Sequence, residues 1–493
     1  MKRVLLLVLC LVFLAGSLFV GCNDNDPSND KTTTGTGTGN ATTEPIETEQ
    51  LTDELPDKNM DGFTFRILHH SQDWLGWATN IMDAEGYTNE PINDAMYDRR
   101  IYLEERFGVE IETEPTWMVN ADAIMPLVMA GECEYHLFMV YDLFATGLFP
   151  YFADMNDIPY LSLDESWWNP EASSIFDIGG TQYVAAGNFS LSVLSRAGGY
   201  SYNNDLVTKY NLTSPYEYVQ KNEWTIENML MMASTVADDI NGDSQITNAD
   251  QFGIEGSVKE QFLRSMFSAG ISLVSQDEEG YPTFTLSSNQ GDIDKLLNIM
   301  EMHSRDDGWY NTTNGDVNVI DATTHGTFMN GRSLFIVSNP HELSRMRDYA
   351  FDLRYVVCPK YSEDQDRYYA PSFGAEIAAI PVSYAKDRAE DIGIILEAMA
   401  FYTNKNIVPK YVDEICTYKY VREDESAEMI ALSFDSLYFD FGINAWQDQV
   451  ALPVLQNYVG LSGNFVNTFA ALDTSVENYI KELVDTLNGT QEG

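Results

Sequence analysis

The sequence predicts an α/β fold built on a parallel β-sheet. Strand-like and helix-like stretches alternate in the order β-α-β-α-β between Gly62 and Asp142, and this order requires crossover helices between parallel strands. The chain has 493 residues, of which 44% are hydrophobic, which is enough for roughly two or three domain-sized cores. Aromatic residues make up 12% of the chain, and their flat faces suit carbohydrate or peptide recognition as well as core packing.

The N-terminal segment predicts a bacterial lipoprotein signal, residues 1–22. A basic start, Lys2-Arg3, precedes the charge-free run Val4–Val20, and Gly21-Cys22 closes the segment. This is the pattern of a secretory signal, and a Cys directly after the small residue would carry a diacylglyceryl group after cleavage. An uncleaved transmembrane anchor is the alternative, although the run is near the lower length limit for spanning. We therefore expect a protein that is lipid-anchored through Cys22 on the extracellular face of the cell membrane.

The next stretch, residues 23–59, predicts a disordered tether. It contains an Asn/Asp-rich segment and a Thr/Gly repeat, followed by scattered Glu and Pro. Too little apolar surface is present to offset the entropy of ordering. The stretch would hold the folded part of the protein away from the membrane.

The folded part is expected to begin at Gly62. Its strands are identified by alternation and its helices by one-sided apolar spacing. Because ligands of parallel sheets bind beyond the carboxyl ends of the strands, the loops Ser71–Trp77 and Tyr141–Gly147 are expected to meet at a ligand site. In chain order the elements are the strand Phe63–Leu68, the helix Asn93–Phe107 with Gly108 as its stop, the strand Val109–Thr113, the helix Ala121–Ala130 and the strand His136–Val140.

Four stretches further along the chain predict helices, namely Trp224–Thr235, Asp294–Met302, Asp387–Tyr402 and a C-terminal helix from Phe465 to Leu487. In the last of these, apolar side chains recur every three or four residues, which predicts an amphipathic helix packed on a core. Phe441–Trp446 contains a glycine and lies between helical regions, so it predicts a loop.

The most specific short motif is an acidic loop of twelve residues. Oxygen-bearing side chains stand at its positions 1, 3, 5, 9 and 12 and the apolar Ile246 at position 8, as in EF-hand-type loops that wrap oxygens around one hard cation. Ser244 and a terminal Asp replace the usual Gly and Glu, so the spacing is closer to a dockerin-type loop. A solvated acidic turn is the alternative. The motif predicts one structural Ca²⁺ ion held by Asp239, Asn241, Asp243, Gln245, Thr247 and Asp250.

The net charge limits the binding partners that we expect, and the cysteines bear on disulfide bonds. The formal net charge is −48, which argues against nucleic acid and against anionic membrane surfaces, so the lipid is the only membrane contact that we expect. Beyond the signal, Cys133, Cys358 and Cys416 are widely spaced. They predict isolated thiols, with a Cys358–Cys416 bridge as the alternative.

The signatures that would name an enzyme are missing from the sequence. It contains no G-x-S-x-G elbow, no H-E-x-x-H pair, no Walker A loop and no G-x-G-x-x-G after a strand. A glycoside hydrolase needs only two suitably placed carboxylates, and the 76 Asp and Glu residues leave that alternative open. We expect a protein without enzymatic activity.

Short segments in a fixed order carry a resemblance to a known family. From about Gly62 to Asn488 they make the chain resemble the family 1 extracellular solute-binding lipoproteins, the carbohydrate receptors of ABC importers. One departure is Asn188, where relatives often have Asp. The segments are Glu90–Tyr97 before Glu104–Val109, Ser166–Trp168, Gly187–Leu191, Tyr202–Asp205, Glu223–Ile226, Asp239–Gly253, Phe328–Phe335 and Asp424–Met429.

The resemblance implies a two-lobed clamshell of the type II periplasmic-binding-protein kind, in which each lobe is a sheet flanked by helices. A monomer would bind a mono- or oligosaccharide in the cleft between the lobes and present it to the permease subunits of the importer. The implied lobes are 60–186 with 375–410 and 187–370 with 415–493, joined by crossings near Gly187, Pro371–Gly374 and Val408–Glu414.

Seven residues are predicted to line the sugar site, with core packing as the alternative for each. Aromatic rings would stack on flat sugar faces, and carboxylate and amide groups would bond the hydroxyls. The resemblance places the last of the seven on the facing lobe. A surface-anchored glycoside hydrolase and a receptor for peptides or modified lipids are the alternative functions. The residues are Trp74, Trp77, Tyr141, Asp142, Asn339, Phe373 and Trp446.

Overall fold

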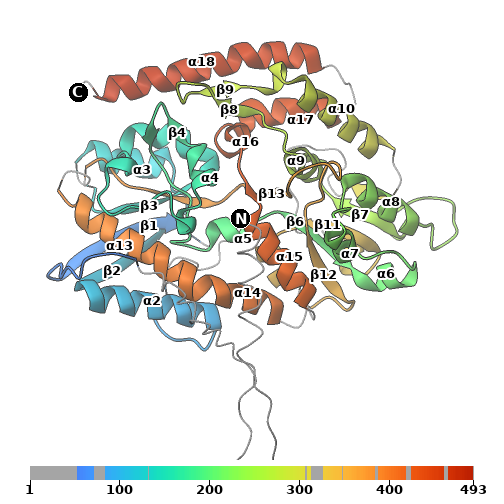
Figure 1. The fold of residues 1–493 in the computed structure, drawn as a ribbon, viewed down its shortest axis with the longest axis horizontal. Helices are drawn as coiled ribbons and strands as arrows, with labels where there is room; N and C mark the ends of the chain where they lie inside the picture. Colours follow the sequence, from blue (N-terminus) through green and yellow to red (C-terminus); the bar gives the residue numbers. More distant parts are fainter. Residues whose placement is uncertain are drawn as a thin grey trace, which may run out of the picture. The chain divides into compact units, whose positions relative to one another are not determined.

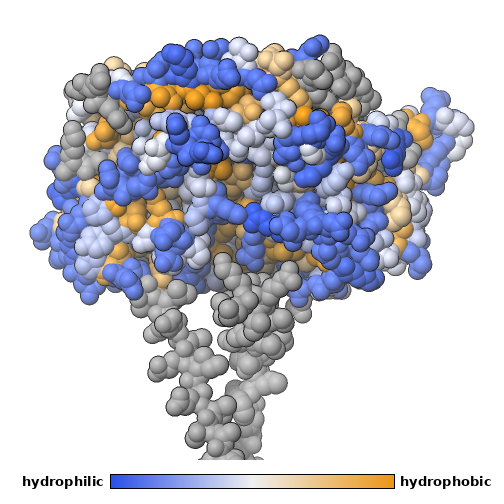
Figure 2. Space-filling model, turned by 45° about the horizontal axis from the view of Figure 1, so that its top comes forward, coloured by the Kyte–Doolittle hydropathy of each residue, from blue (hydrophilic) through white to orange (hydrophobic). Residues whose placement is uncertain are grey.

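Two main β-sheets flanked by helices form the folded part of the chain (Figure 1). The computed structural model describes residues 53–71, 84–131, 133–305, 308–311, 326–346, 348–383, 387–417, 424–459 and 465–491. The two sheets with their flanking helices confirm the predicted α/β class. In Figure 2, hydrophilic residues predominate on the face that is shown, and an apolar strip interrupts them near the top of the view.

The first sheet has the strand order β14-β3-β1-β2. Its strand β1 (Phe63–His70) pairs in parallel with β2 (Val109–Thr116) and with β3 (Leu137–Tyr141). The fourth strand, β14 (Glu376–Ala379), comes from much later in the chain and pairs antiparallel with β3. The chain thus returns to its first sheet after it has built the second.

The crossovers of the first sheet are the helices α2 (Pro91–Phe107) and α3 (Ala121–Met129), which confirms the predicted β-α-β-α-β order. Gly108 ends α2 in the left-handed conformation, at φ 62°. A Cβ at this position would lie only 2.5 Å from the side-chain oxygen of Asn59. Both constraints favour glycine, as the sequence predicted.

The second sheet is mixed, with the order β10-β7-β11-β6-β12. Strand β7 (Phe252–Gly256) runs parallel to β10 (Trp309–Asn311) and β11 (Ser333–Ser338). Strand β6 (Gly199–Asn203) runs antiparallel to β11 and to β12 (Leu353–Val357). The strands β6, β7, β11 and β12 are almost entirely buried, because helices cover the sheet.

The remaining elements cover and connect the two sheets. They are η1 (Asp142–Tyr151), η2 (Met155–Asp157), η3 (Ser166–Trp168), α4 (Pro170–Ser174), β4 (Asp177–Ile178), β5 (Thr181–Gln182), α5 (Ser192–Ser195), α6 (Asn204–Lys209), α7 (Pro215–Gln220), α8 (Ile226–Val236), α9 (Val258–Ser268), β8 (Val274–Gln276), β9 (Pro282–Phe284), η4 (Leu286–Ser288), α10 (Gln290–Ser304), α11 (Gly326–Met329), α12 (Pro340–Arg345), β13 (Ala370–Pro371), α13 (Ala389–Tyr402), η5 (Thr403–Ile407), α14 (Val408–Thr417), α15 (Asp424–Asp435), β15 (Leu437–Tyr438), α16 (Phe441–Asn444), η6 (Gln447–Ala451), α17 (Leu452–Val459) and α18 (Phe465–Gln491).

The four later helices that the sequence predicted are present as α8, α10, α13 and α18. The C-terminal helix buries Phe469, Leu472, Val476 and Leu487, so its amphipathic reading is confirmed. The loop predicted for Phe441–Trp446 is wrong. The short helix α16 occupies most of it, because Asp440 accepts a hydrogen bond from the N–H of Gly442 and caps the first turn.

Part of the stretch predicted as a tether belongs to the described structure. Residues 53–59, which the prediction assigned to the tether, pack against helices of the folded part. Asp53 forms an ion pair with Arg106, and Lys58 lies 2.6 Å from the carboxylate of Asp391. Charged pairs hold this segment, and the apolar pattern on which the prediction relied does not register them.

Two further sequence predictions concern thiols and membrane spans. Cys133 and Cys358 carry free, buried thiols, so the alternative Cys358–Cys416 bridge is absent. Burial raises the pKa of the Cys358 thiol to about 12. Among the residues that the structure describes, no helix combines the length and apolarity needed to cross a bilayer.

Candidate functional site

The carboxyl ends of β1 and β3 meet the start of β14 at one edge of the first sheet. Nδ1 of His70 lies 2.9 Å from Oε1 of Glu376, and the His70 ring lies 5.9 Å from the ring of Tyr141. All three side chains are buried, and burial raises the pKa of Tyr141. The strand ends therefore gather polar and aromatic side chains at a single place, where parallel sheets take ligands.

Asp142 follows β3 and is fully buried. Its carboxylate accepts hydrogen bonds from the N–H of Leu143 at 2.8 Å, from the N–H of Gly374 at 3.1 Å and from the amide of Asn444 at 2.7 Å. Burial raises the pKa of Asp142 to about 7, while these donors act in the opposite direction. The acceptor positions that we expected to bind sugar hydroxyls are thus filled by donors of the protein itself.

Two arginines contact Phe373 and the residues beside it. Arg196, half-buried at the end of α5, donates from Nε to the backbone oxygen of Phe373 at 3.4 Å. Arg264 of α9 is buried, donates to the backbone oxygen of Pro371, and places its guanidinium carbon 4.8 Å from the centroid of the Phe373 ring. The ring of Phe373 is therefore held between the protein's own groups rather than displayed to solvent.

Gly374 allows these groups to approach one another. Its φ is +77°, and a Cβ there would lie 2.6 Å from the hydroxyl of Tyr141. Any other residue would be strained in its backbone and would displace the tyrosine. We call Tyr141, Asp142, Arg196, Phe373 and Gly374 the crossing site, because it joins the end of β3 to the segment that leads from the second sheet back to the first.

Asn339 lies at the start of α12, on the second-sheet side. It is 1% exposed, and its side chain accepts a hydrogen bond from the N–H of Glu342 at 3.0 Å, which makes it the helix cap. Glu342 is also buried, and burial followed by the nearby Glu260 raises its pKa to about 7. In this structure capping accounts for Asn339, and its contact with a sugar stays a prediction.

The predicted tryptophans are not brought together. Trp446 is 5% exposed and packs edge-on against Phe441, with ring centroids 4.6 Å apart, and against Tyr479 at 6.1 Å. It fills a core instead of presenting an open face, because α16 turns it inward. Trp74 and Trp77 lie outside the described residues. The use of these three residues as sugar platforms stays a prediction.

Trp117 is an aromatic residue that the sequence prediction missed. It directly follows β2 and is 61% exposed. His70, at the end of β1, is paired in register with Thr116, so Trp117 stands at the same edge of the sheet as the crossing site. The position of Trp117 directly after the second strand could have indicated a ligand loop. The predicted strand ends at Thr113, three residues before the end of β2, so the prediction does not place Trp117 at a strand end.

The acidic loop of residues 239–250 is an exposed turn closed by its own side chains. Asp239 accepts hydrogen bonds from the N–H groups of Gly242 and Ser244, at 2.7 and 2.8 Å. Among the described residues, which include the whole loop, no three His, Cys, Asp or Glu side chains are grouped closely enough to hold a metal ion. Asp250 is fully buried, and its Oδ1 has no hydrogen-bond partner. That orphaned oxygen is the feature of the loop that fits a cation ligand.

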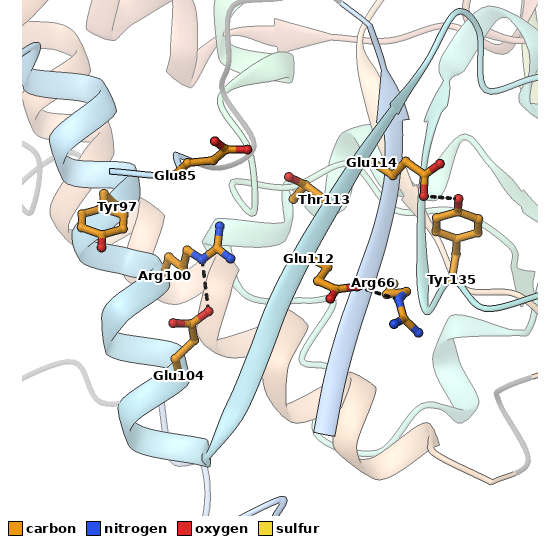
Figure 3. A pocket seen from close by; sticks show the side chains of 9 residues that line it. All are labelled: Arg66, Glu85, Tyr97, Arg100, Glu104, Glu112, Thr113, Glu114 and Tyr135. Carbon is orange, nitrogen blue, oxygen red and sulfur yellow. Dashed lines mark hydrogen bonds and ion pairs between the residues drawn. The ribbon is translucent and has the colours of Figure 1, made fainter. Parts of the chain in front are cut away.

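A separate cavity of about 580 Å³ lies against β2 and α2 (Figure 3). Its polar groups are paired with one another: Arg66 with Glu112 at 2.7 Å, Arg100 with Glu104 at 3.1 Å and Tyr135 with Glu114 at 2.6 Å. None of the predicted ligand residues lines it. Since parallel sheets take ligands beyond the carboxyl ends of their strands, and the crossing site lies where β1 and β3 end, we take the crossing site as the candidate functional site. The lining residues are Arg66, Glu85, Tyr97, Arg100, Glu104, Glu112, Thr113, Glu114 and Tyr135.

The fold is that of the two-domain periplasmic-binding-protein-like proteins. The chain is similar to the galacto-N-biose/lacto-N-biose I-binding protein of the ABC transporter from Bifidobacterium longum, solved with lacto-N-biose, with 12% identity, a TM-score of 0.55 and coverage of 86% of this chain and 98% of that one. It is also similar to UspC from M. tuberculosis, with 14% identity, a TM-score of 0.54 and coverage of 84% and 100%. A third similar structure is the cyclic α-maltosyl-1,6-maltose-binding protein from Arthrobacter globiformis, with 13% identity, a TM-score of 0.53 and coverage of 85% and 100%.

Identities this low establish the shared fold alone. The resemblance to carbohydrate receptors of ABC importers, and the two-lobed α/β architecture that it implied, are confirmed at that level. By their names these neighbours are binding proteins rather than enzymes. No protein-family model and no curated protein matches the chain.

Proposed function

We propose that this protein is the substrate-binding component of an ABC importer and that its ligand is a mono- or oligosaccharide. The observation that carries the proposal is the fold, which the chain shares over 84–86% of its length with three solved proteins, two of which are named as sugar-binding proteins. Permease subunits are the partners, the protein acts as a monomer, and no covalent chemistry is required.

The crossing site suits this function mechanically. Asp142 ties the end of β3 to Gly374 and to Asn444, so the strands of the first sheet are linked to segments that return from the second. A sugar held at this edge favours the closed state by its differential affinity for the two states. The permease then recognises the closed form.

The test of this class of function is a paired measurement on neutral oligosaccharides. Ligand binding raises the free energy of unfolding by RT ln(1 + [L]/Kd) and with it the melting temperature, whereas a glycoside hydrolase releases new reducing ends. A thermal shift without reducing ends supports the receptor. Release of reducing ends would establish the hydrolase, and binding confined to peptides or lipids on an array would establish a non-sugar receptor.

Trp117 is the described aromatic residue that we expect to stack on the sugar. Trp117→Ala should weaken sugar binding at least about tenfold, since about 1.4 kcal/mol corresponds to tenfold and an aromatic platform contributes on that order. The melting temperature should hardly change, because the side chain is exposed. Isothermal titration calorimetry gives the affinity. Tyr160→Ala, which removes an aromatic ring that is 43% exposed elsewhere, is the matched control. Equal affinity of the Trp117→Ala and control variants would remove Trp117 from the site.

The anchor is the second part of the proposal. The charge-free run that ends in Gly21-Cys22 supports a lipid on Cys22. Cys22→Ser should release the protein from the membrane fraction or block its processing, because the hydroxyl does not take the lipid. Cys10→Ser, inside the same signal, should change nothing. A Cys22→Ser protein that stays in the membrane at mature size would refute the anchor.

One structural Ca²⁺ ion in the acidic loop is the third part. The buried, unpartnered Oδ1 of Asp250 supports it. Extracellular loops of this type bind at about 10⁻⁴–10⁻³ M, so millimolar calcium should raise the melting temperature of the wild type. Asp239→Ala combined with Asp243→Ala should abolish the rise. The double variant Glu278→Ala, Glu279→Ala loses the same charge from another exposed turn and should keep it. Identical wild-type melting curves in calcium and in chelator would disprove the site.

A further inference from the structure

A groove of about 570 Å³ lies between the C-terminal helix α18 and the pair η6–α17. The helices α17 and α18 contact each other, and α17 is drawn below α18 in Figure 1. The residues that line the groove lie after those of the crossing site in the sequence. The volume of the groove lies within the range of roughly 300–1,000 Å³ that is typical of ligand sites. Its apolar floor includes Leu472, and Tyr479 borders it, half-buried against Trp446.

The lining of the groove carries few charged side chains. Asp448 is the single acid among the described residues that line it, and no described Lys or Arg lines it. The polar lining consists mainly of neutral amides and hydroxyls. The groups that matter most are the amides of Gln449, Gln456 and Asn467 and the hydroxyl of Ser475.

These groups are available to a ligand. Gln449, Gln456 and Asn467 are exposed, and within the part of the chain that the structure describes their side chains and that of Ser475 have no hydrogen-bond partner. The cavity beside β2 shows the opposite arrangement, since its arginines and glutamates are paired with one another. An amide both donates and accepts, so the free amides along the groove match the hydroxyls of a sugar chain, and Tyr479 offers an aromatic ring to a flat sugar face.

We propose that the groove between η6–α17 and α18 is a second carbohydrate site, which binds a neutral glycan chain independently of the crossing site. Charged ligands are disfavoured, because the lining offers no cation to pair with an anion and only one carboxylate for a cation. An extended peptide would need pockets for side chains, and the floor of the groove offers only a shallow apolar surface built by Pro453, Ala471 and Leu472.

The test uses the full-length protein on an array of neutral gluco-, xylo-, manno- and galacto-oligosaccharides, with affinities measured by calorimetry. The triple variant Gln449→Ala, Gln456→Ala, Asn467→Ala removes the free amides while the fold is kept, because all three side chains are exposed. At least one glycan bound by the wild type should bind the triple variant at least about tenfold more weakly, which corresponds to 1.4 kcal/mol. The same glycan should still bind Trp117→Ala, which separates this site from the proposed function.

Asn478→Ala is the control, because Asn478 is an exposed asparagine on the same helix that does not line the groove. It should bind every glycan as the wild type does. The proposal is overturned if the triple variant keeps wild-type affinity for every glycan. It is also overturned if the array shows only charged glycans, if peptides alone bind, or if all binding is lost in Trp117→Ala.

Discussion

Replacing Trp446 with alanine is expected to lower the free energy of unfolding by about 3–5 kcal/mol, the usual cost of removing a large buried ring. The side chain is 5% exposed and contacts the rings of Phe441 and Tyr479. From the sequence we expected a loop residue whose loss weakens sugar binding without loss of folding. Because the ring is buried, we expect a loss of stability, which urea denaturation measures; the contact of Trp446 with a sugar stays a prediction.

The comparison with Trp117→Ala makes the result decisive. Trp117 is 61% exposed, so its replacement should leave the unfolding free energy within about 0.5 kcal/mol of the wild type. Trp446→Ala should therefore lose stability, whereas Trp117→Ala should lose sugar affinity. If Trp446→Ala keeps wild-type stability and loses sugar affinity instead, Trp446 is a ligand platform and its burial in the structure belongs to another state of the site.

Replacing Glu397 with alanine is expected to cost a similar amount, about 3–5 kcal/mol, because it orphans several buried donors at once. Glu397 is 1% exposed and accepts hydrogen bonds from the indole N–H groups of Trp167 at 2.8 Å and Trp168 at 2.6 Å, and from the N–H of Ser162 at 3.2 Å. The carboxylate thus holds two large rings in one place. Burial raises its pKa, and the three donors oppose that shift.

The loss of the Glu397 carboxylate should also disturb the segment around Gly187, where the resemblance implies a crossing between lobes. A Cβ on Gly187 would lie 2.6 Å from the Trp168 ring, so a released ring would press on this segment. Glu397→Gln keeps the volume and one acceptor oxygen, and we expect it to lose less stability than the alanine variant. Glu390→Ala is the control on the same helix, because its side chain is 52% exposed in an ion pair with Lys58 and such pairs contribute about 0–1 kcal/mol. A Glu397→Ala variant as stable as this control would contradict the expected role.

Elements with a strong local pattern were predictable from the sequence. The parallel order of β1, β2 and β3 follows from alternating strands with helices between them, and the end of α2 follows from Gly108, which alone accepts a left-handed backbone without strain. The C-terminal helix follows from apolar spacing over many turns. In each case the determining interactions lie within a few residues of one another.

The candidate site was predictable only in part. The convergence of Tyr141 with the end of β1 follows the rule that ligands gather at the carboxyl ends of parallel strands. The state of Asp142 does not follow from it, because its partners Gly374 and Asn444 are more than 230 residues away in sequence. Periodicity carries no information about such a partner. For the same reason the exposed Trp117 was missed and the buried Trp446 was taken for an exposed one.

The sequence by itself determined the α/β class, the crossover helices of the first sheet, the amphipathic C-terminal helix and the resemblance to sugar receptors. These are properties of local periodicity, of single glycines and of short segments in order. The tertiary structure alone decided that Asp142 and Phe373 are held by the protein's own groups, that Trp446 fills a core, and that free amides line a groove beside α18. The physical reason is that burial and hydrogen bonding depend on which distant segments pack together, and side chains of the same type are equivalent in sequence until that packing exposes one and covers another.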